Sequence, residues 1–305
     1  MLNSYRYRKL LFQDIYKNIK ALKNQEKLVF LSYIIIMTVN LEEIGLSSIV
    51  DQFDLFFIDI WGVVHNGIKL YPDAIKVLER LNDKNKDYVL LTNAPRPNST
   101  VINFLKKMGL AKLHCEKVYT SGEAALRFLN EKSKKSKFFH IGPPRDFDLF
   151  FSFKENKVKN INDSEFLLCT GLFDEYIEDL NYYKNLLKNK KELEMICTNP
   201  DLIVDRGNKR EYCAGTIAKI FEEEGGKVEY FGKPYPLVYK LSAKIKNKKI
   251  LCIGDNLNTD IKGANLQNFS SLFISSGIHK NETNLSLTFK NHNVRVDYLQ
   301  SYLKW

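Results

Sequence analysis

The sequence predicts an α/β protein, with a parallel-sheet core and a second α/β block inserted into it. Three observations support this prediction. From residue 53 onward, apolar runs of strand length alternate with stretches whose apolar residues recur at helical spacing. Strand, helix and strand follow one another through short connections, which is typical of a parallel sheet. A block from about residue 121 to 227 interrupts the core and is large enough to form a domain of its own.

The first part of the chain alternates between strands and helices. Pro72 suits the first turn of a helix, and the apolar residues after it, from Ala74 to Leu81, have helical spacing. Gly109 stops the helix that precedes it. The expected strands lie at 55–60, 88–92 and 118–120. One helix is expected to begin at Tyr71, and two others to span 98–108 and 123–129.

The inserted block and the return to the core continue this pattern. Inside the block we expect strands at 138–141, 166–169 and 194–197 and helices at 174–188 and 214–224. The core then resumes with strands at 228–231, 250–253 and 271–275, helices at 236–245 and 258–266, and a C-terminal helix over 294–305.

The first 36 residues do not belong to the pattern. A basic stretch leads into the mostly apolar run from Leu28 to Ile36, which is too short to span a bilayer. No small-residue cleavage site follows it, as a signal peptide would require. We expect translation to start at Met37 and residues 1–40 to be an extension outside the fold. Attachment to a membrane surface is the alternative, and stable membrane insertion is not expected.

Composition argues against several classes of function. The net charge of +10 comes largely from the basic residues of 1–27 and from lysines scattered over helices; since no nucleic-acid-binding module is recognisable, we do not expect nucleic acid as a partner. The five cysteines are odd in number and lack a CxxC pair, which argues against a disulfide framework or a zinc site. We expect a reducing, cytoplasmic location. Dinucleotide binding is disfavoured because no GxGxxG motif follows a strand.

Polar residues follow four of the predicted strands at the point where each strand ends. They are Asp59, the pair Thr92 and Asn93, Lys233, and Asp255. Aspartate is disfavoured inside strands, so an acid at the end of an apolar run is more often functional than structural. Ligands of open α/β sheets bind at the carboxyl ends of the strands, and we expect these side chains to form one site. Thr92 and Asn93 can donate to phosphate oxygens there or cap a helix.

This set has the parts that phosphoryl transfer needs, which are positioning and charge stabilisation. Asp59 can act as a nucleophile, and Asp255 can be a second carboxylate for Mg²⁺, a metal that prefers hard oxygen ligands. Asp260 can orient the metal's ligands or favour the N-terminus of the next helix. Lys233 supplies a fixed positive charge to the transferring group. The sequence therefore predicts a site suited to an aspartyl-phosphate intermediate.

The ordered motifs resemble the haloacid dehalogenase-like (HAD) hydrolase superfamily, whose members carry a strand-end Asp, a Ser/Thr, a Lys and a terminal Asp pair in this order. Three segments, Cys197–Asp201, Gly232–Pro234 and Gly254–Asp260, resemble subfamily IIA, the branch that contains nucleotide, sugar-phosphate and p-nitrophenyl phosphatases. The resemblance covers about residues 45–278.

The resemblance implies both fold and chemistry. It implies a Rossmann-like core over 41–120 and 228–305, with an inserted α/β cap over 121–227 that selects the substrate and excludes water on closure. It also implies Mg²⁺ as cofactor and hydrolysis of a small phosphorylated metabolite through Asp59. A homodimer formed through the cap is left open.

One position departs from the family's pattern. Phosphatases of the family usually have Asp two residues after the nucleophile, as general acid and base, and here that residue is Trp61. The Trp61 carbonyl can still bind the metal, but indole cannot carry a proton, and such help is typically worth about 10²–10⁴-fold in rate. His65 is the nearest candidate for a proton relay, since histidine titrates near neutrality; a packed loop histidine is the alternative. Trp61 can also close the pocket over a substrate ring, and Gly62 is expected in the phosphate-binding turn.

A phosphatase is the leading function, with one alternative. The alternative is a phosphate-binding or regulatory protein that kept the site and lost turnover, and Trp61 favours it. A phospho-acceptor receiver domain is disfavoured because receivers are much shorter and lack an inserted domain. Arg206 and Arg210 are candidate contacts for a substrate anion, although surface charge explains them equally well.

Overall fold

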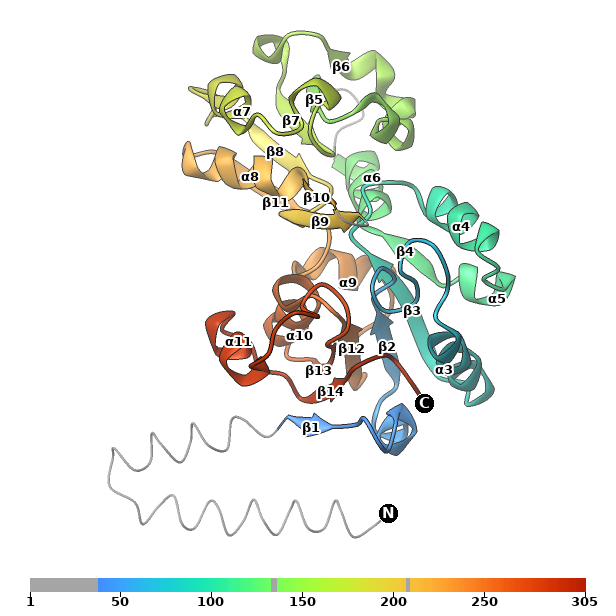
Figure 1. The fold of residues 1–305 in the computed structure, drawn as a ribbon. Helices are drawn as coiled ribbons and strands as arrows, with labels where there is room; N and C mark the ends of the chain where they lie inside the picture. The colour runs from blue at the N-terminus through green and yellow to red at the C-terminus, as the bar shows by residue number, and fades with distance from the viewer. Residues whose placement is uncertain (1–37, 133–135, 207–208) are drawn as a thin grey trace. The chain divides into compact units, whose positions relative to one another are not determined.

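The structure, a computed structural model, describes residues 38–132, 136–206 and 209–305 (Figure 1). The chain divides into two units, 1–39 and 40–305, and the architecture below is that of the second. The expected start at Met37 and the extension before it lie outside the described residues. Within the described ranges, no helix combines the length and the apolar character that crossing a bilayer requires.

A seven-stranded sheet forms the base of the second unit. Its order is β1-β14-β13-β12-β2-β3-β4, and every pair from β14 to β4 is parallel. The strands are β1 (Val39–Asn40), β2 (Leu55–Ile58), β3 (Asp87–Thr92), β4 (Val118–Thr120), β12 (Ile250–Gly254), β13 (Ser270–Ile274) and β14 (Tyr298–Gln300). The predicted α/β class and parallel core are confirmed.

Helices cover both faces of this sheet, with α3, α4 and α5 on one side and α9 and α10 on the other (Figure 1). All four residues of β2 are buried, as expected of a strand with both faces covered. Pro72 stands at the start of α3, and Ala74, Val77, Leu78 and Leu81 are its buried residues, as their spacing predicts. The helices are α3 (Pro72–Asp83), α4 (Asn98–Lys107), α5 (Lys112–Cys115), α6 (Ser121–Lys132), α9 (Pro236–Ser242), α10 (Lys262–Leu266) and α11 (Leu285–Asn291).

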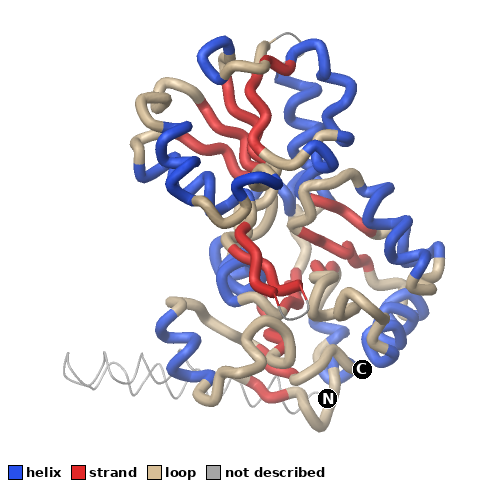
Figure 2. The backbone as a smooth tube through the Cα atoms, turned by 45° about the horizontal axis from the view of Figure 1, so that its top comes forward, coloured by secondary structure: helices blue, strands red, loops and turns tan. Residues whose placement is uncertain are grey.

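A second parallel sheet has the order β11-β8-β7-β5-β6. Helices α7 (Leu180–Leu187) and α8 (Ala214–Glu223) pack on it, and both sheets show strands flanked by helices (Figure 2). One apolar core runs from the first sheet through α6 to the second. The strands are β5 (Phe138–Ile141), β6 (Lys157–Val158), β7 (Phe166–Cys169), β8 (Glu194–Cys197) and β11 (Lys227–Tyr230), with a separate hairpin of β9 (Ile203–Arg206) and β10 (Lys209–Tyr212).

The described residues also contain seven 3₁₀ or π-helical segments. Six are 3₁₀ helices, and η7 is a π-helical turn that precedes α10. They are η1 (Leu46–Ser48), η2 (Val50–Gln52), η3 (Pro144–Asp146), η4 (Asp148–Asn156), η5 (Ile161–Asp163), η6 (Asp174–Tyr176) and η7 (Leu257–Ile261).

The structure corrects three expected elements. The strand expected at 228–231 belongs to the second sheet, where β11 pairs with β8, because pairing depends on tertiary partners that the strand's own pattern does not specify. The expected C-terminal helix is wrong: Tyr298 and Gln300 are buried with Leu299 between them, a period-two pattern, and form β14. The helix expected over 174–188 is interrupted, since Asp179 accepts a hydrogen bond from Tyr182 N (3.1 Å) and starts α7 as its N-cap.

Candidate active site

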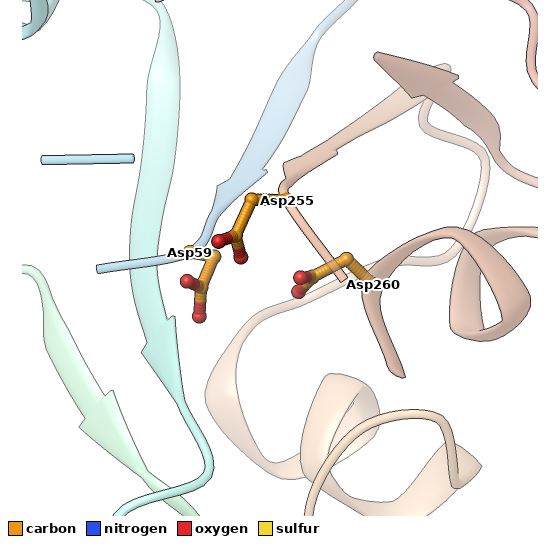
Figure 3. Close-up of side chains that lie close together, drawn as sticks. All are labelled: Asp59, Asp255 and Asp260. Atoms are coloured by element: carbon orange, nitrogen blue, oxygen red, sulfur yellow. The ribbon is translucent and has the colours of Figure 1, made fainter. Parts of the chain in front are cut away.

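Three aspartates meet at the carboxyl edge of the first sheet (Figure 3). Asp59 follows β2 and Asp255 follows β12, and these strands are parallel neighbours, so both carboxylates emerge at one edge. Asp260 comes from η7. All three side chains are buried, and each has a carboxylate oxygen within 4.8 Å of those of the other two. The three carboxylates that the sequence predicts as metal ligands are therefore brought together, and the Trp61 carbonyl stays a prediction.

Lys233 is the cation that faces these carboxylates. Its buried Nζ donates to the Asp59 carboxylate, to Asp260 Oδ1 (2.7 Å) and to the carbonyl oxygen of Leu91 (3.0 Å). Burial alone would lower the pKa of Lys233, but the charges and hydrogen bonds of Asp260 and Asp59 raise it well above its ordinary value. Lys233 is thus a permanent ammonium group, fixed between two of the three aspartates.

The three aspartates carry more negative charge than one lysine can balance. Burial, with help from Asp260 and Asp201, raises the pKa of Asp59 to about 7 against the opposing effect of Lys233. The pKa of Asp255 is raised well above its ordinary value, chiefly by burial and then by Asp59 and Asp260. Divalent cations with hard oxygen ligands suit such a cluster. The donor set therefore fits Mg²⁺, with Asp59, Asp255 and Asp260 as the side chains that would hold it.

Two glycines let the backbone approach Asp255 closely. Gly62 has a φ of +84°, and a Cβ built there would lie 2.1 Å from Asp255 Oδ2. Gly277 would place a Cβ 1.9 Å from the same oxygen, and the next residue, Ile278, donates its N–H to it (2.8 Å). Gly62, predicted in a phosphate-binding turn, lies against a metal-ligand candidate. Sequence reasoning missed Gly277 and Ile278, and their position in the loop that follows β13 was the available signal.

Asn93 is engaged with protein groups. Its Oδ1 accepts from Lys233 N (2.7 Å), and its Nδ2 donates to the Lys233 carbonyl (2.9 Å) and to Asp201 Oδ1 (3.0 Å). This geometry makes Asn93 a brace for Lys233, whereas the sequence predicts a phosphate contact. Thr92, half-buried beside it, accepts from Ala94 N (3.3 Å) through Oγ1 and stays a candidate for phosphate.

Trp61 and His65, in the loop after Asp59, form an edge-to-face aromatic pair with ring centroids 5.1 Å apart. Trp61 is 40% exposed and His65 is buried. Gly67, with a φ of +89°, passes so close to the indole that a Cβ there would lie 2.8 Å from it. His65 Nδ1 accepts a hydrogen bond from Gly67 N (2.8 Å), which leaves that nitrogen without a proton.

Comparison with known proteins identifies the family. A family profile for haloacid dehalogenase-like hydrolases matches residues 56–152, and a HAD-hydrolase-like profile matches 230–301. A haloacid dehalogenase-like hydrolase from Brucella suis 1330 is 32% identical in sequence, with a TM-score of 0.69 over 77% of this chain and 93% of that one. The chain belongs to the haloacid dehalogenase-like hydrolase family. The two matched ranges leave between them most of the second sheet.

Two curated relatives of this hydrolase are phosphatases. A dihydroxyacetone phosphatase of Corynebacterium glutamicum (strain R) is 24% identical over 73% of this chain and 81% of its own length. A 4-nitrophenylphosphatase of Schizosaccharomyces pombe is 23% identical over 77% of this chain and 88% of its own. These matches support a phosphoric monoester hydrolase.

Within this HAD hydrolase, the geometry of His65 favours packing over proton transfer. Burial lowers the pKa of His65 to about 4, so the imidazole is neutral at physiological pH. Its Nδ1 is occupied by Gly67, and its ring packs against Trp61 and also Phe104, with a centroid distance of 5.6 Å to the latter. Of the two interpretations left open by the sequence, the packed loop histidine agrees better with these contacts.

We predict that His65→Asn keeps kcat within about threefold of the wild-type value and leaves the pH–rate profile unchanged. A pH–rate profile reports the pKa values of the groups that carry protons in catalysis, and a packed histidine does not contribute to it. The asparagine Oδ1 can replace Nδ1 as acceptor for Gly67. His65→Ala loses both this acceptor and the ring, and it should lower the free energy of unfolding by about 1–3 kcal/mol. Loss of one limb of the profile in His65→Asn would contradict the packing role.

Arg206 and Arg210 lie in β9 and β10, where they pair with Lys209 and Asp205 in the backbone register. Their side chains lie outside the described part of the chain. Both remain predictions as substrate contacts.

Proposed function

We propose that this HAD hydrolase is a Mg²⁺-dependent phosphatase of a small phosphorylated metabolite that works through an aspartyl-phosphate intermediate on Asp59. One observation carries the proposal. The buried Lys233 ammonium bridges Asp59 and Asp260 while Asp255 completes a carboxylate cluster at the same sheet edge. A nucleophile, a fixed cation and a set of hard oxygen ligands are the parts that phosphoryl transfer requires.

In the first step a carboxylate oxygen of Asp59 attacks phosphorus, and the bond from phosphorus to the ester oxygen breaks. The leaving alcohol departs and the phosphoryl group stays on Asp59. Lys233 holds the attacking carboxylate of Asp59 in place and faces the charge of the transferring group. Mg²⁺, held by Asp59, Asp255, Asp260 and the Trp61 carbonyl, would supply the charge that lets two anions approach.

In the second step water attacks the phosphorus of the aspartyl-phosphate, and the bond from phosphorus to the Asp59 oxygen breaks. The products are inorganic phosphate and the regenerated carboxylate. In the first step the leaving alcohol takes a proton from solvent, and in the second the attacking water releases a proton to solvent. Because indole cannot act as a general acid or base near neutral pH, we propose that Trp61 makes the enzyme slow or selective for good leaving groups.

We predict that Trp61→Asp raises kcat for an alkyl phosphate such as dihydroxyacetone phosphate by about 10–100-fold, since it adds a proton carrier next to the site. The gain for p-nitrophenyl phosphate should be smaller because p-nitrophenolate leaves without protonation. Trp61→Asn, which has the same shape and cannot carry a proton, is the matched control. An equal gain in Trp61→Asn would assign the effect to removal of the ring.

We further propose that the second sheet and its helices, from about residue 137 to 231, act as the cap that selects the substrate. Asp201, in the loop after β8 of the second sheet, contacts Asn93, which follows β3 of the first, and this contact supports the role. The homodimer formed through the cap and the cytoplasmic location stay predictions; sedimentation of the purified protein would test the first.

Phosphate release from p-nitrophenyl phosphate and dihydroxyacetone phosphate, with and without Mg²⁺, tests the proposed function. We expect release that depends on Mg²⁺. The second candidate, favoured by Trp61, is a phosphate-binding protein without turnover. It would be chosen if no substrate released phosphate while orthovanadate still raised the melting temperature in the presence of Mg²⁺.

A further inference from the structure

We propose that Asp201 is a positioning residue for Lys233, and that it acts through the side-chain amide of Asn93. The inference rests on the proposed function, because it assigns a further residue to the same site. Asp201 belongs to the loop after β8, and Lys233 to the loop after β11. These strands are parallel neighbours in the second sheet, with Cys197 opposite Tyr230. Asn93 enters between the two loops from the end of β3 in the first sheet.

The hydrogen bonds allow one orientation of the Asn93 amide. Oδ1 accepts from Lys233 N (2.7 Å), and Nδ2 donates to two acceptors, the Lys233 carbonyl (2.9 Å) and Asp201 Oδ1 (3.0 Å). If the amide were rotated by half a turn, its Nδ2 would face the N–H of Lys233, which is also a donor. Its Oδ1 would face the Lys233 carbonyl and Asp201 Oδ1, which are both acceptors. Asp201 therefore helps to select the orientation in which Asn93 holds both backbone polar groups of Lys233.

Asp201 is itself fixed by its own loop. Its N–H donates to Asn199 Oδ1 (3.0 Å), and its carbonyl accepts from Gly215 N (3.1 Å) in the first turn of α8. A Cβ on Gly215 would lie 2.6 Å from that carbonyl oxygen, so the loop lies directly against the helix. These contacts fix the backbone of Asp201, from which its carboxylate reaches Asn93.

The space around the Asn93 amide is equally restricted. A Cβ on Gly232 would lie 2.7 Å from Asn93 Oδ1 and 2.6 Å from Pro200 Cδ. The residue before Lys233 therefore lies directly against both Asn93 and Pro200, which belongs to the loop that carries Asp201. Because Lys233 Nζ bonds both Asp59 and Asp260, a shift of the Lys233 backbone moves the ammonium group at the reacting centre.

The role requires an acceptor at Asp201, which need not be charged. The charged groups that face Asp201 are Lys233, Asp260 and Asp59, besides the amide of Asn93. Burial raises the pKa of Asp201 to about 6, against the hydrogen bond from Asn93 and the charge of Lys233. A carboxylate is a stronger acceptor than an amide oxygen, yet Asp201→Asn keeps the acceptor and Asp201→Ala removes it. The two variants therefore separate hydrogen bonding from charge.

The experiment compares Asp201→Ala, Asp201→Asn, Asn93→Ala and the double alanine variant in the full chain with Mg²⁺ and p-nitrophenyl phosphate. We expect Asp201→Ala to lower kcat about 10–100-fold with KM changed less than about threefold, because small misplacements of a catalytic group act on the chemical step. Asp201→Asn should recover most of this loss with the pH–rate profile intact. The double variant should be no slower than Asn93→Ala, since both act through one brace.

Hydrogen exchange at the Lys233 backbone N–H gives a readout that does not need turnover. We expect exchange at least about tenfold faster in Asp201→Ala and close to the wild-type rate in Asp201→Asn, because the N–H is protected by the oriented Asn93 oxygen. The amide of Phe231, which donates to the Cys197 carbonyl, serves as the internal control. Absence of any phosphatase activity would refute the proposed function and leave this readout to judge the brace.

Two results would overturn the inference. In the first, Asp201→Asn is as slow as Asp201→Ala and loses one limb of the pH–rate profile while exchange at Lys233 stays slow; Asp201 would then carry a proton and would not position Lys233. In the second, exchange at Lys233 is unchanged in Asp201→Ala and the two alanine substitutions multiply, so that the residues act independently.

Discussion

Asp59→Asn should lower phosphate release by about 10⁴-fold or more, the order of loss that follows removal of a covalent nucleophile. The amide keeps the shape of the side chain, and Lys233 can still donate to its oxygen, so the site stays assembled without an attacking carboxylate. Release from p-nitrophenyl phosphate in saturating Mg²⁺ measures the effect, with circular dichroism to confirm the fold. Asp73→Asn, an exposed aspartate of α3 paired with Lys76, is the matched control and should keep full activity.

The same substitution should stabilise the protein at pH 8 in the absence of metal. The pKa of Asp59 is raised from its ordinary value to about 7, so the folded state binds an extra proton between about pH 4 and pH 7. Stability from such a group is full at low pH and declines as pH rises through the folded-state pKa. At pH 8 Asp59 is ionised, and burying its charge lowers the stability of the wild type by a few kcal/mol, at about 1.36 kcal/mol per unit of pKa shift. The asparagine variant carries no charge at this position and has no such cost. Equal melting temperatures at pH 8 would contradict the raised pKa.

Removal of Mg²⁺ should abolish turnover, by about 10³-fold or more, since the metal masks charge at both the attacking and the transferring group. It should also make stability fall with rising pH. The carboxylates must lose their protons to bind the metal, so the increase in melting temperature caused by Mg²⁺ should be larger at pH 8 than at pH 5.5.

Thermal unfolding with EDTA and with Mg²⁺ at the two pH values measures this effect. Asp255→Asn should lose most of the Mg²⁺-dependent increase, and Asp73→Asn should keep it. An increase of the same size in Asp255→Asn would show that Mg²⁺ binds elsewhere on the protein.

The meeting of Asp59 and Asp255 at one sheet edge could be predicted from the sequence because the signal lies within each strand and the residue that follows it. An apolar run followed by an acid marks the end of a buried strand, and parallel neighbours place their ends together, so Asp59 and Asp255 could be brought to one edge without a structure. The inserted parallel block was predictable for the same reason: β5, β7 and β8 are short apolar runs, and all four residues of β5 and β7 lie at least half-buried.

Other features depend on pairings between distant parts of the chain. The pattern of β11 permits either sheet, and only its partner, β8, decides between them. Asn93 and Asp201 lie 108 residues apart, and nothing in either segment specifies the other. The pKa of His65 is lowered by burial, its Nδ1 accepts from Gly67, and its ring packs against Trp61. None of these contacts can be predicted from the residue type alone. These interactions were beyond a reading of single segments.

The placement of Lys233 constrains any attempt to engineer this enzyme by recombination. Lys233 follows β11, a strand of the second sheet, although its ammonium group serves Asp59 in the first. A graft that replaced the inserted block with that of a relative, in order to import another substrate preference, would also import the strand that presents the lysine. The downstream junction of such a chimaera should therefore follow Lys233. Asn93 of the recipient must then form its hydrogen bonds with the donor residues that replace Asp201 and Lys233.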